Sequence, residues 1–226
     1  MDPTILLLLP ALLLSFYAEH KVKSTFVKYS QIGSHKGMTG AQVAAKLLAA
    51  SGIRDVKVQP VPGQLTDHYD PRAKAVCLSE AVYNQSSLAA VGVAAHEVGH
   101  AIQHNRDYGP LAFRTGLFPA AQLGSNLSMP ILIVGLLISY SGFGPWLLYA
   151  GILLFSLTVL FQLITLPVEF NASSRAIGLL QDNHILSAHE AAPAKKVLDA
   201  AALTYVAAAV SSILTLLRFL ILAKRR

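Results

Sequence analysis

The chain has 226 residues, of which 54% are apolar and 13% are charged, and its formal net charge is +6. Soluble globular domains carry about 25% charged residues, so this composition excludes an ordinary soluble protein and indicates that much of the chain lies in a membrane. The basic residues are scattered rather than interleaved with aromatic residues along a stripe, and we therefore expect no nucleic acid as a partner. The single cysteine, Cys77, excludes an internal disulfide and is interpreted as a small apolar residue of a strand.

Four apolar segments have roughly the length of spanning helices, and they cover residues 3–18, 117–140, 145–166 and 202–222. The first is short and could be a signal peptide, but it lacks a basic start and an A-x-A cleavage pattern, so we predict an uncleaved anchor. The second and third are separated by the turn formers Ser141-Gly142-Phe143-Gly144-Pro145. This interruption predicts a transmembrane hairpin over residues 117–166.

Two polar stretches remain, residues 19–116 and 167–201. With four spans both stretches lie on the same side of the membrane, because the intervening hairpin returns the chain to the side from which it came. We therefore predict a single domain built from both stretches.

Basic residues near the ends of the spans predict the side on which this domain lies. Eight stand on the side of the polar stretches and three follow the last span: Lys21, Lys23, Lys28, Arg106, Arg114, Arg175, Lys195 and Lys196 against Lys224, Arg225 and Arg226. The excess predicts a multi-pass protein of the inner membrane with its polar domain in the cytoplasm. The basic C-terminus argues for the opposite orientation.

The polar stretches carry the signals of a small mixed α/β domain. Thr39 and Gln42 have the spacing of a capping box, which predicts a helix to about Ala50, and Ser187 and Glu190 have the same spacing. The remaining patterns predict a strand over residues 56–59, ended by Pro60, Pro62 and Gly63, and a turn-like loop over residues 67–72. They then predict a strand over residues 75–78, a helix over residues 88–104 and a helix that starts near Val168.

The segment His96-Glu97-Val98-Gly99-His100 carries the chemistry. Two histidines four residues apart share one face of a helix, one turn apart, so both can bind one zinc ion. Glu97 stands beside them and can accept a proton from a water molecule activated by the metal. Gly92 and Gly99 indicate close packing of another helix. A long apolar helix around the motif argues against two incidental histidines.

A hydrolytic zinc site needs three protein ligands and an open position. His104 lies about 12 Å along the helix axis from His96, too far to share one metal easily. The metzincin pattern is excluded because Gln103 and Arg106 stand where a glycine and a third histidine are required. Glu169, directly after the third span, is the predicted third ligand. The rival carboxylates, each with a less direct geometry, are Glu19, Glu80 and Glu190.

Hydrolysis also needs a group that stabilises the oxyanion of the tetrahedral intermediate. We expect Arg175 in this role first, because it lies on the same predicted helix as Glu169. The other candidates are His68, His184 and His189.

Two blocks of sequence resemble a known family. Asp67-His68-Tyr69-Asp70-Pro71 with the run from Val93 to His104, and the run from Leu166 to Ser173, are similar to the membrane-bound neutral zinc metallopeptidases of bacteria. More distantly, the layout resembles the heat-shock membrane proteases and the CAAX prenyl proteases, both of which are gluzincins. The resemblance covers nearly the whole chain.

This resemblance implies His96, His100 and Glu169 as zinc ligands and Glu97 as the general base. The gluzincin families commonly carry an aspartate four residues after the ligand glutamate, where it supports a ligand histidine. Ser173 stands at that position here, so Asn171 or Ser173 could take over the support. In gluzincins a strand before the zinc helix can be the edge that pairs with an extended substrate. Residues 75–78 could have this role or be an ordinary structural strand.

Together these patterns predict a mostly α membrane protein with about four transmembrane helices and a small α/β gluzincin-like zinc peptidase domain. The expected activity is that of a zinc metalloendopeptidase with one Zn²⁺ per chain, acting on peptides or membrane proteins. Two alternatives remain open at this stage: a catalytically inert zinc-bound membrane scaffold, and a metallo-hydrolase of non-peptide amides or esters. An intact Glu97 argues against the scaffold, since binding alone needs no base.

Overall fold

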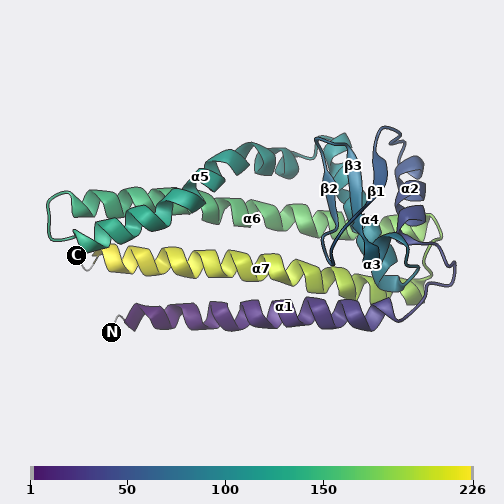
Figure 1. The fold of residues 1–226 in the computed structure, drawn as a ribbon, viewed down its shortest axis with the longest axis horizontal. Coiled ribbons are helices and arrows are strands. Elements are labelled where there is room, and N and C mark those ends of the chain that lie inside the picture. The colour runs from purple at the N-terminus through teal and green to yellow at the C-terminus, as the bar shows by residue number, and fades with distance from the viewer. Residues whose placement is uncertain (1–2, 225–226) are drawn as a thin grey trace. The chain divides into compact units, whose positions relative to one another are not determined.

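The computed structural model describes residues 3–224 and consists mainly of helices, with one small sheet of three strands (Figure 1). The chain divides into two compact units. The apolar unit contains the described residues up to Glu19, Ala112–Pro167 and the described residues from Thr204 onward. The site unit contains His20–Leu111 and Val168–Leu203. Each unit is therefore built from segments that are far apart in the sequence. Arg225 and Arg226, which entered the prediction of orientation, lie outside the described residues.

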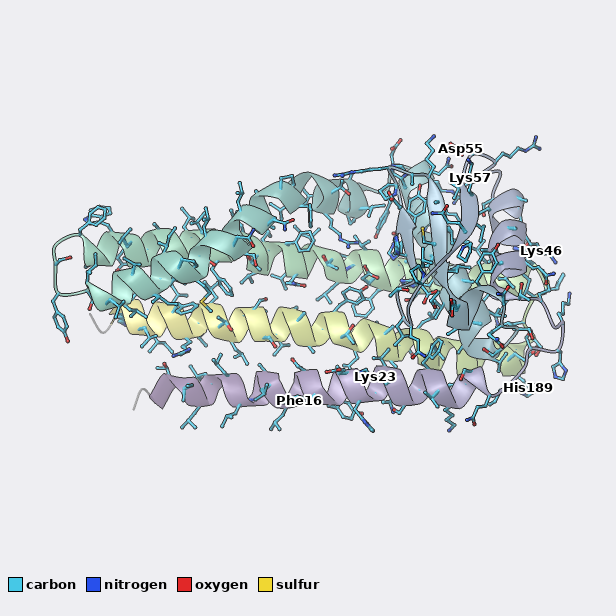
Figure 2. The ribbon with its side chains drawn as sticks, viewed as in Figure 1. Phe16, Lys23, Lys46, Asp55, Lys57 and His189 are labelled. Carbon is cyan, nitrogen blue, oxygen red and sulfur yellow. The ribbon has the colours of Figure 1, made fainter. Side chains whose placement is uncertain are left out.

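Four helices of the described chain are long and apolar enough to cross a membrane, which confirms the prediction of four spans. These helices are α1 (Leu8–Ser30), which follows the short 3-10 helix η1 (Pro3–Leu7), and α5 (Gly109–Leu137), α6 (Gly144–Asp182) and α7 (Ala188–Lys224). Large side chains on them are exposed: Leu137 by 76%, and Phe16, labelled in Figure 2, by 61%. Apolar surface on this scale is stable in contact with hydrocarbon rather than with water.

Small residues let α5 and α6 approach each other closely within the apolar unit. A Cβ atom at Gly124 would collide with the carbonyl oxygen of Leu154, and one at Gly151 would lie 2.6 Å from the Leu132 side chain. Close backbone approach at small residues is a common way to pack helices in a membrane, where apolar burial alone does not drive association. The two helices are separate, as the turn formers around Gly142 predict.

The sheet of the site unit has the order β1-β3-β2, with β1 (Lys57–Val61) parallel and β2 (His68–Asp70) antiparallel to the central strand β3 (Ala75–Ser79). Every residue of β3 is buried, including Cys77, which confirms the interpretation of that cysteine. The prediction that Pro60, Pro62 and Gly63 end the first strand is wrong for Pro60 and right for Pro62, which directly follows the last residue of β1. Pro60 lies within β1, an edge strand, where a missing N–H is tolerated.

The loop predicted over residues 67–72 is also partly wrong, because residues 68–70 form β2. A strand of three residues carries little pattern of its own, and it forms here because it pairs with β3. In the chain, β2 is followed by β3, and the short helix α3 (Glu80–Tyr83) comes directly after β3.

Helix α4 (Leu88–Asn105) runs through the core of the site unit and packs against α2 (Gly40–Ala50) and the sheet (Figure 1). The capping box at the start of α2 is confirmed: the Gln42 N–H donates to Thr39 Oγ1, and the Thr39 N–H donates to Gln42 Oε1. Gly92 of α4 lies against Ala194 of α7, and Gly99 lies against Ala172 of α6. The close packing predicted from Gly99 is therefore confirmed, whereas a Cβ at Gly92 would make only ordinary contact with Ala194.

The helix expected to start near Val168 does not start there, because α6 continues without a break from Gly144 through Pro167 to Asp182. A proline removes one helical hydrogen bond, but neighbouring contacts can hold the helix together. Val168 and Ala172, just after the proline, are fully buried in the site unit. The second predicted capping box is half formed: Glu190 accepts hydrogen bonds from the N–H and the hydroxyl of Ser187.

Candidate metal centre

Helix α4 presents His96 and His100 on one face, one turn apart, as their spacing predicts. Ser87 caps the helix by accepting a hydrogen bond from the Ala90 N–H. Both imidazole side chains are 13% exposed, and their rings meet edge to face with centroids 4.7 Å apart. Their Nε2 atoms lie 3.1 Å apart. The helix thus places two imidazole nitrogens where one ion can bind both.

Glu169 of α6 completes a cluster of three potential ligands. Its Oε2 lies 3.3 Å from Nε2 of His96 and 3.4 Å from Nε2 of His100, and the residue is 2% exposed. Gly99 makes this approach possible, because a Cβ there would lie 2.8 Å from the carbonyl oxygen of Ala172, one turn of α6 beyond Glu169. The ligand atoms of the three residues all lie within 4.8 Å of one another.

The rival carboxylates are not in this cluster. Glu190 is engaged elsewhere: its Oε1 accepts a hydrogen bond of 2.7 Å from the His35 N–H and its Oε2 binds Ser187. Glu19 and Glu80 are exposed. His104 also lies outside the cluster, and its Nδ1 is 2.9 Å from the Tyr69 hydroxyl.

Gln103 decides which nitrogen of His100 carries the proton. The Gln103 amide nitrogen donates to the carbonyl of Val168 at 2.8 Å, and a carbonyl can only accept, so this end of the side chain must be the NH₂ group. Its Oε1 therefore faces Nδ1 of His100, 3.0 Å away, and Nδ1–H is the donor. The Nε2 lone pair of His100 consequently points at the cluster.

Gln103 is fully buried, and its amide nitrogen also donates to Oδ1 of Asn171 at 3.0 Å. Ser173 lies behind the other histidine, with its Oγ 3.2 Å from Nδ1 of His96. Both residues expected to replace the missing aspartate thus lie behind the histidines, Ser173 directly and Asn171 through Gln103. The sequence reasoning missed Gln103 itself, although its position three residues after His100 on the same helical face was a signal.

The donor set fits a divalent cation. Two imidazole nitrogens and a carboxylate oxygen face each other at 3.1–3.4 Å, and electron-rich atoms at such distances repel unless positive charge lies between them. Burial lowers the pKa of His100, but the carboxylates of Glu169 and Glu97 outweigh it, so the pKa lies above its ordinary value. The site thus favours positive charge. Nitrogen and oxygen ligands of this kind suit zinc.

Glu97, the predicted general base, lies on the same turn of α4 as the histidines and is only 7% exposed. Burial raises the pKa of its carboxyl group, opposed by the nearby histidines and reinforced by the charges of Glu169 and Asp67. Asp67 is held beside the sheet by hydrogen bonds from the backbone N–H and the hydroxyl of Ser79. A buried carboxylate with a raised pKa is a better proton acceptor than an exposed one.

Arg175 lies at the far end of the hydrogen-bonded chain that starts at His100. Its Nε donates to Oδ1 of Asn171 at 2.7 Å, and its guanidinium group lies 5.9 Å from the centre of the Tyr108 ring. The other candidates for oxyanion stabilisation, His68, His184 and His189, are all exposed, and Nδ1 of His68 lies 2.8 Å from the carbonyl oxygen of Thr66.

The idea that residues 75–78 form a substrate-binding edge is wrong. They belong to β3, which is the central strand and has a partner on both sides. The strand of the sheet that packs on α4 and has a free outer edge is β2. Tyr69 of β2 contacts His104, one turn beyond His100 on α4.

Comparisons with known proteins give one family and one relative. Residues 4–224 match the model of a family described as "putative neutral zinc metallopeptidase". The chain is also 48% identical over 218 residues to the "putative membrane protease YugP" of Bacillus subtilis (strain 168), an alignment that covers 96% of this chain and 95% of the relative. No solved structure gives a significant match. The chain therefore belongs to the family of membrane proteins described as putative neutral zinc metallopeptidases.

Proposed function

We propose that this protein is a membrane-embedded zinc metalloendopeptidase of the gluzincin type, with one zinc ion held by His96, His100 and Glu169. The observation that carries the proposal is the meeting of three ligand atoms from two helices, with Glu97 on the same turn of α4 as the histidines. An inert scaffold would need the ligands but not a buried carboxylate beside them. The family and the name of the Bacillus subtilis relative support a peptidase.

Zinc in this site would polarise the scissile carbonyl group and lower the pKa of a water molecule toward about 7. Glu97 accepts the proton of the attacking water and then delivers it to the leaving amine nitrogen. Gln103 and Ser173 hold the imidazole rings so that their Nε2 atoms stay directed at the ion. Arg175 remains our proposed stabiliser of the oxyanion. Asn171 holds its guanidinium group in place by accepting a hydrogen bond from Nε.

An extended peptide would pair with the outer edge of β2, which offers unpaired backbone groups beside the zinc helix. Backbone pairing places few demands on the side chains of the substrate, so we propose unfolded peptides and exposed segments of membrane proteins as substrates. Glu169 follows Pro167 by two residues at the end of an apolar run, which favours substrates near the bilayer surface. The excess of basic residues around the polar stretches favours a site on the cytoplasmic side of the inner membrane.

The test is Glu97→Gln, with Glu80→Gln, an exposed glutamate of the same unit, as the matched control. Both variants should bind zinc like the wild-type protein in detergent. Hydrolysis of unfolded casein should fall by about 10²–10⁴-fold in Glu97→Gln, the usual contribution of a general base, and stay unchanged in Glu80→Gln. Full activity in a zinc-loaded Glu97→Gln protein would rule out Glu97 as the base.

A further inference from the structure

A groove of about 470 Å³ lies between α1 and α7 in the site unit and shares no lining residue with the metal centre. Three lysines line it: Lys21 and Lys28 from α1, and Lys196 from α7. All three are exposed, so their ammonium groups can meet a ligand that approaches from outside. Because the groove and the metal centre are separate, a role in peptide hydrolysis does not explain the groove.

The net charge of the groove is positive. Asp199 is the one acidic residue among those that line it, and both of its carboxylate oxygens lie 2.7 Å from Nζ of Lys195. That lysine stands outside the lining and compensates the charge of Asp199. The three lining lysines therefore keep their full positive charge toward the groove, which selects an anionic ligand.

The floor of the groove has a different character from its rim. Thr25, Tyr29 and Ala200 also line the groove and are buried, in contrast to the exposed lysines, and Nζ of Lys28 lies 5.5 Å from the centre of the Tyr29 ring. A cationic rim above a mainly apolar floor matches an amphiphile with a negative head and a hydrocarbon body. It matches inorganic phosphate or an acidic peptide less well, because neither would use the floor.

The groove lies where two apolar segments end, and this position also favours a lipid as the ligand. Lys21 stands three residues after Ala18, where the first apolar segment ends, and Leu203 of the groove lies at the start of the last apolar segment. Both helices therefore change from apolar to basic sequence at the groove, as they would where lipid headgroups lie. A basic pocket beside spanning helices is a known kind of site for anionic lipid headgroups.

We propose that this groove binds the headgroup of an anionic phospholipid and thereby stabilises the packing of α1 against α7. The proposal does not rest on peptidase activity, since no residue of the metal centre takes part. Lys21, Lys28 and Lys196 bind the phosphate group, and the floor and Leu203 contact the glycerol and the first part of the acyl chains.

The test compares two triple variants that lose the same charge. The groove variant carries Lys21→Gln, Lys28→Gln and Lys196→Gln, and the distal control carries Lys36→Gln, Lys46→Gln and Lys57→Gln. Lys46 and Lys57, labelled in Figure 2, lie on α2 and β1, away from α1 and α7. The measurement is the thermal midpoint of the detergent-purified protein during titration with phosphatidylglycerol, with phosphatidylcholine, or with inorganic phosphate.

Phosphatidylglycerol should raise the midpoint of the wild-type protein and the distal control by about 3–6 °C near saturation, as expected for a ligand that binds only the folded state. The groove variant should show no more than the small shift that phosphatidylcholine causes. A Lys→Arg triple variant of the groove should keep the shift, because the charge is retained. It also serves as the folding control, together with equal midpoints of all variants without lipid.

Three outcomes would overturn the proposal. Equal loss of the shift in the groove and distal variants would mean that only the total charge matters. Equal shifts with phosphatidylglycerol and phosphatidylcholine in the wild-type protein would mean that the groove does not select anionic lipids. An equal shift with inorganic phosphate would mean that the site recognises a free anion and that the apolar floor plays no part.

Discussion

Both units contain a glycine at which two helices approach closely, but the result of this contact differs between them. In the apolar unit, Gly124 allows α6 to approach until the carbonyl oxygen of Leu154 fills the place of a Cβ. In the site unit, Gly99 does the same for the carbonyl oxygen of Ala172. The first contact joins apolar side chains, whereas the second brings Glu169 to His96 and His100. Close packing thus contributes stability in one unit, and both stability and ligand geometry in the other.

The largest effect should come from adding one methyl group at each glycine. Gly99→Ala should lower the thermal midpoint and also weaken zinc binding by more than about 100-fold, because α4 and α6 must separate. Gly124→Ala should lower the midpoint and leave zinc binding unchanged. Zinc titration of both purified variants beside thermal scans measures the two effects separately.

Gly92→Ala is the control within the same helix, because a Cβ there would make only ordinary contact with Ala194 at 3.5 Å. An alanine also favours the helix over glycine by about 1 kcal/mol, so this variant should be neutral or more stable. Equal zinc affinity of Gly99→Ala and the wild-type protein would contradict the view that this contact sets the ligand geometry.

Metal removal should affect the site unit and not the hairpin of the apolar unit. A strong chelator should lower protection from hydrogen exchange in α4 and in residues 168–180, because bound metal contributes its binding free energy to the fold that holds it. Hydrogen exchange in α5 and in residues 144–160 should stay unchanged. A uniform loss of protection over both units would show instead that the ion stabilises the chain as a whole.

A smaller effect on zinc binding is expected from changing Gln103, which holds the ligand His100 through a hydrogen bond. Gln103→Ala leaves Nδ1 of His100 without its acceptor and Val168 without its donor, and should weaken zinc binding about 10–100-fold. Gln103→Glu restores the acceptor but not the donor, so it should recover part of the affinity. A purely structural role would instead give both variants the same affinity. Gln42→Ala removes a glutamine from a helix cap and should not change the affinity.

The smallest effect should come from Ser173, which makes one hydrogen bond of 3.2 Å to His96. Ser173→Ala should weaken zinc binding less than Gln103→Ala, by at most about tenfold. Ser173→Asp would introduce the carboxylate that gluzincins carry at this position and should bind zinc at least as tightly as the wild-type protein. Competition with a coloured zinc chelator measures these differences.

Local patterns were sufficient for part of this site. The spacing of His96 and His100 and the apolar residues around them predict the helix and the shared face, because helix geometry depends on neighbours in sequence. Glu169 could be proposed because it directly follows the third span. Gln103 was only partly accessible to this reasoning: its contact with His100 lies on the same helix, but its other two partners lie on α6, 65 and 68 residues away. A buried glutamine looks like an exposed one in sequence.

The errors have the same origin. Residues 68–70 form a strand only through pairing with β3, and pairing partners are not visible in a single sequence. The continuation of α6 through Pro167 depends on the burial of Val168 and Ala172, which is also a property of the folded structure. Both errors therefore concern features set by contacts between elements, whereas features set within one helix were predicted correctly.

The most direct test of the central claim is the metal content of the detergent-purified protein, with wild type, Glu169→Ala and Glu80→Ala compared side by side. We predict one zinc ion per chain in the wild-type protein and in Glu80→Ala, and loss or strong weakening of binding in Glu169→Ala. Zinc held at full affinity by Glu169→Ala would contradict the account, because the third ligand would then lie elsewhere. A wild-type protein that binds no zinc even after zinc is added would contradict the metal centre itself.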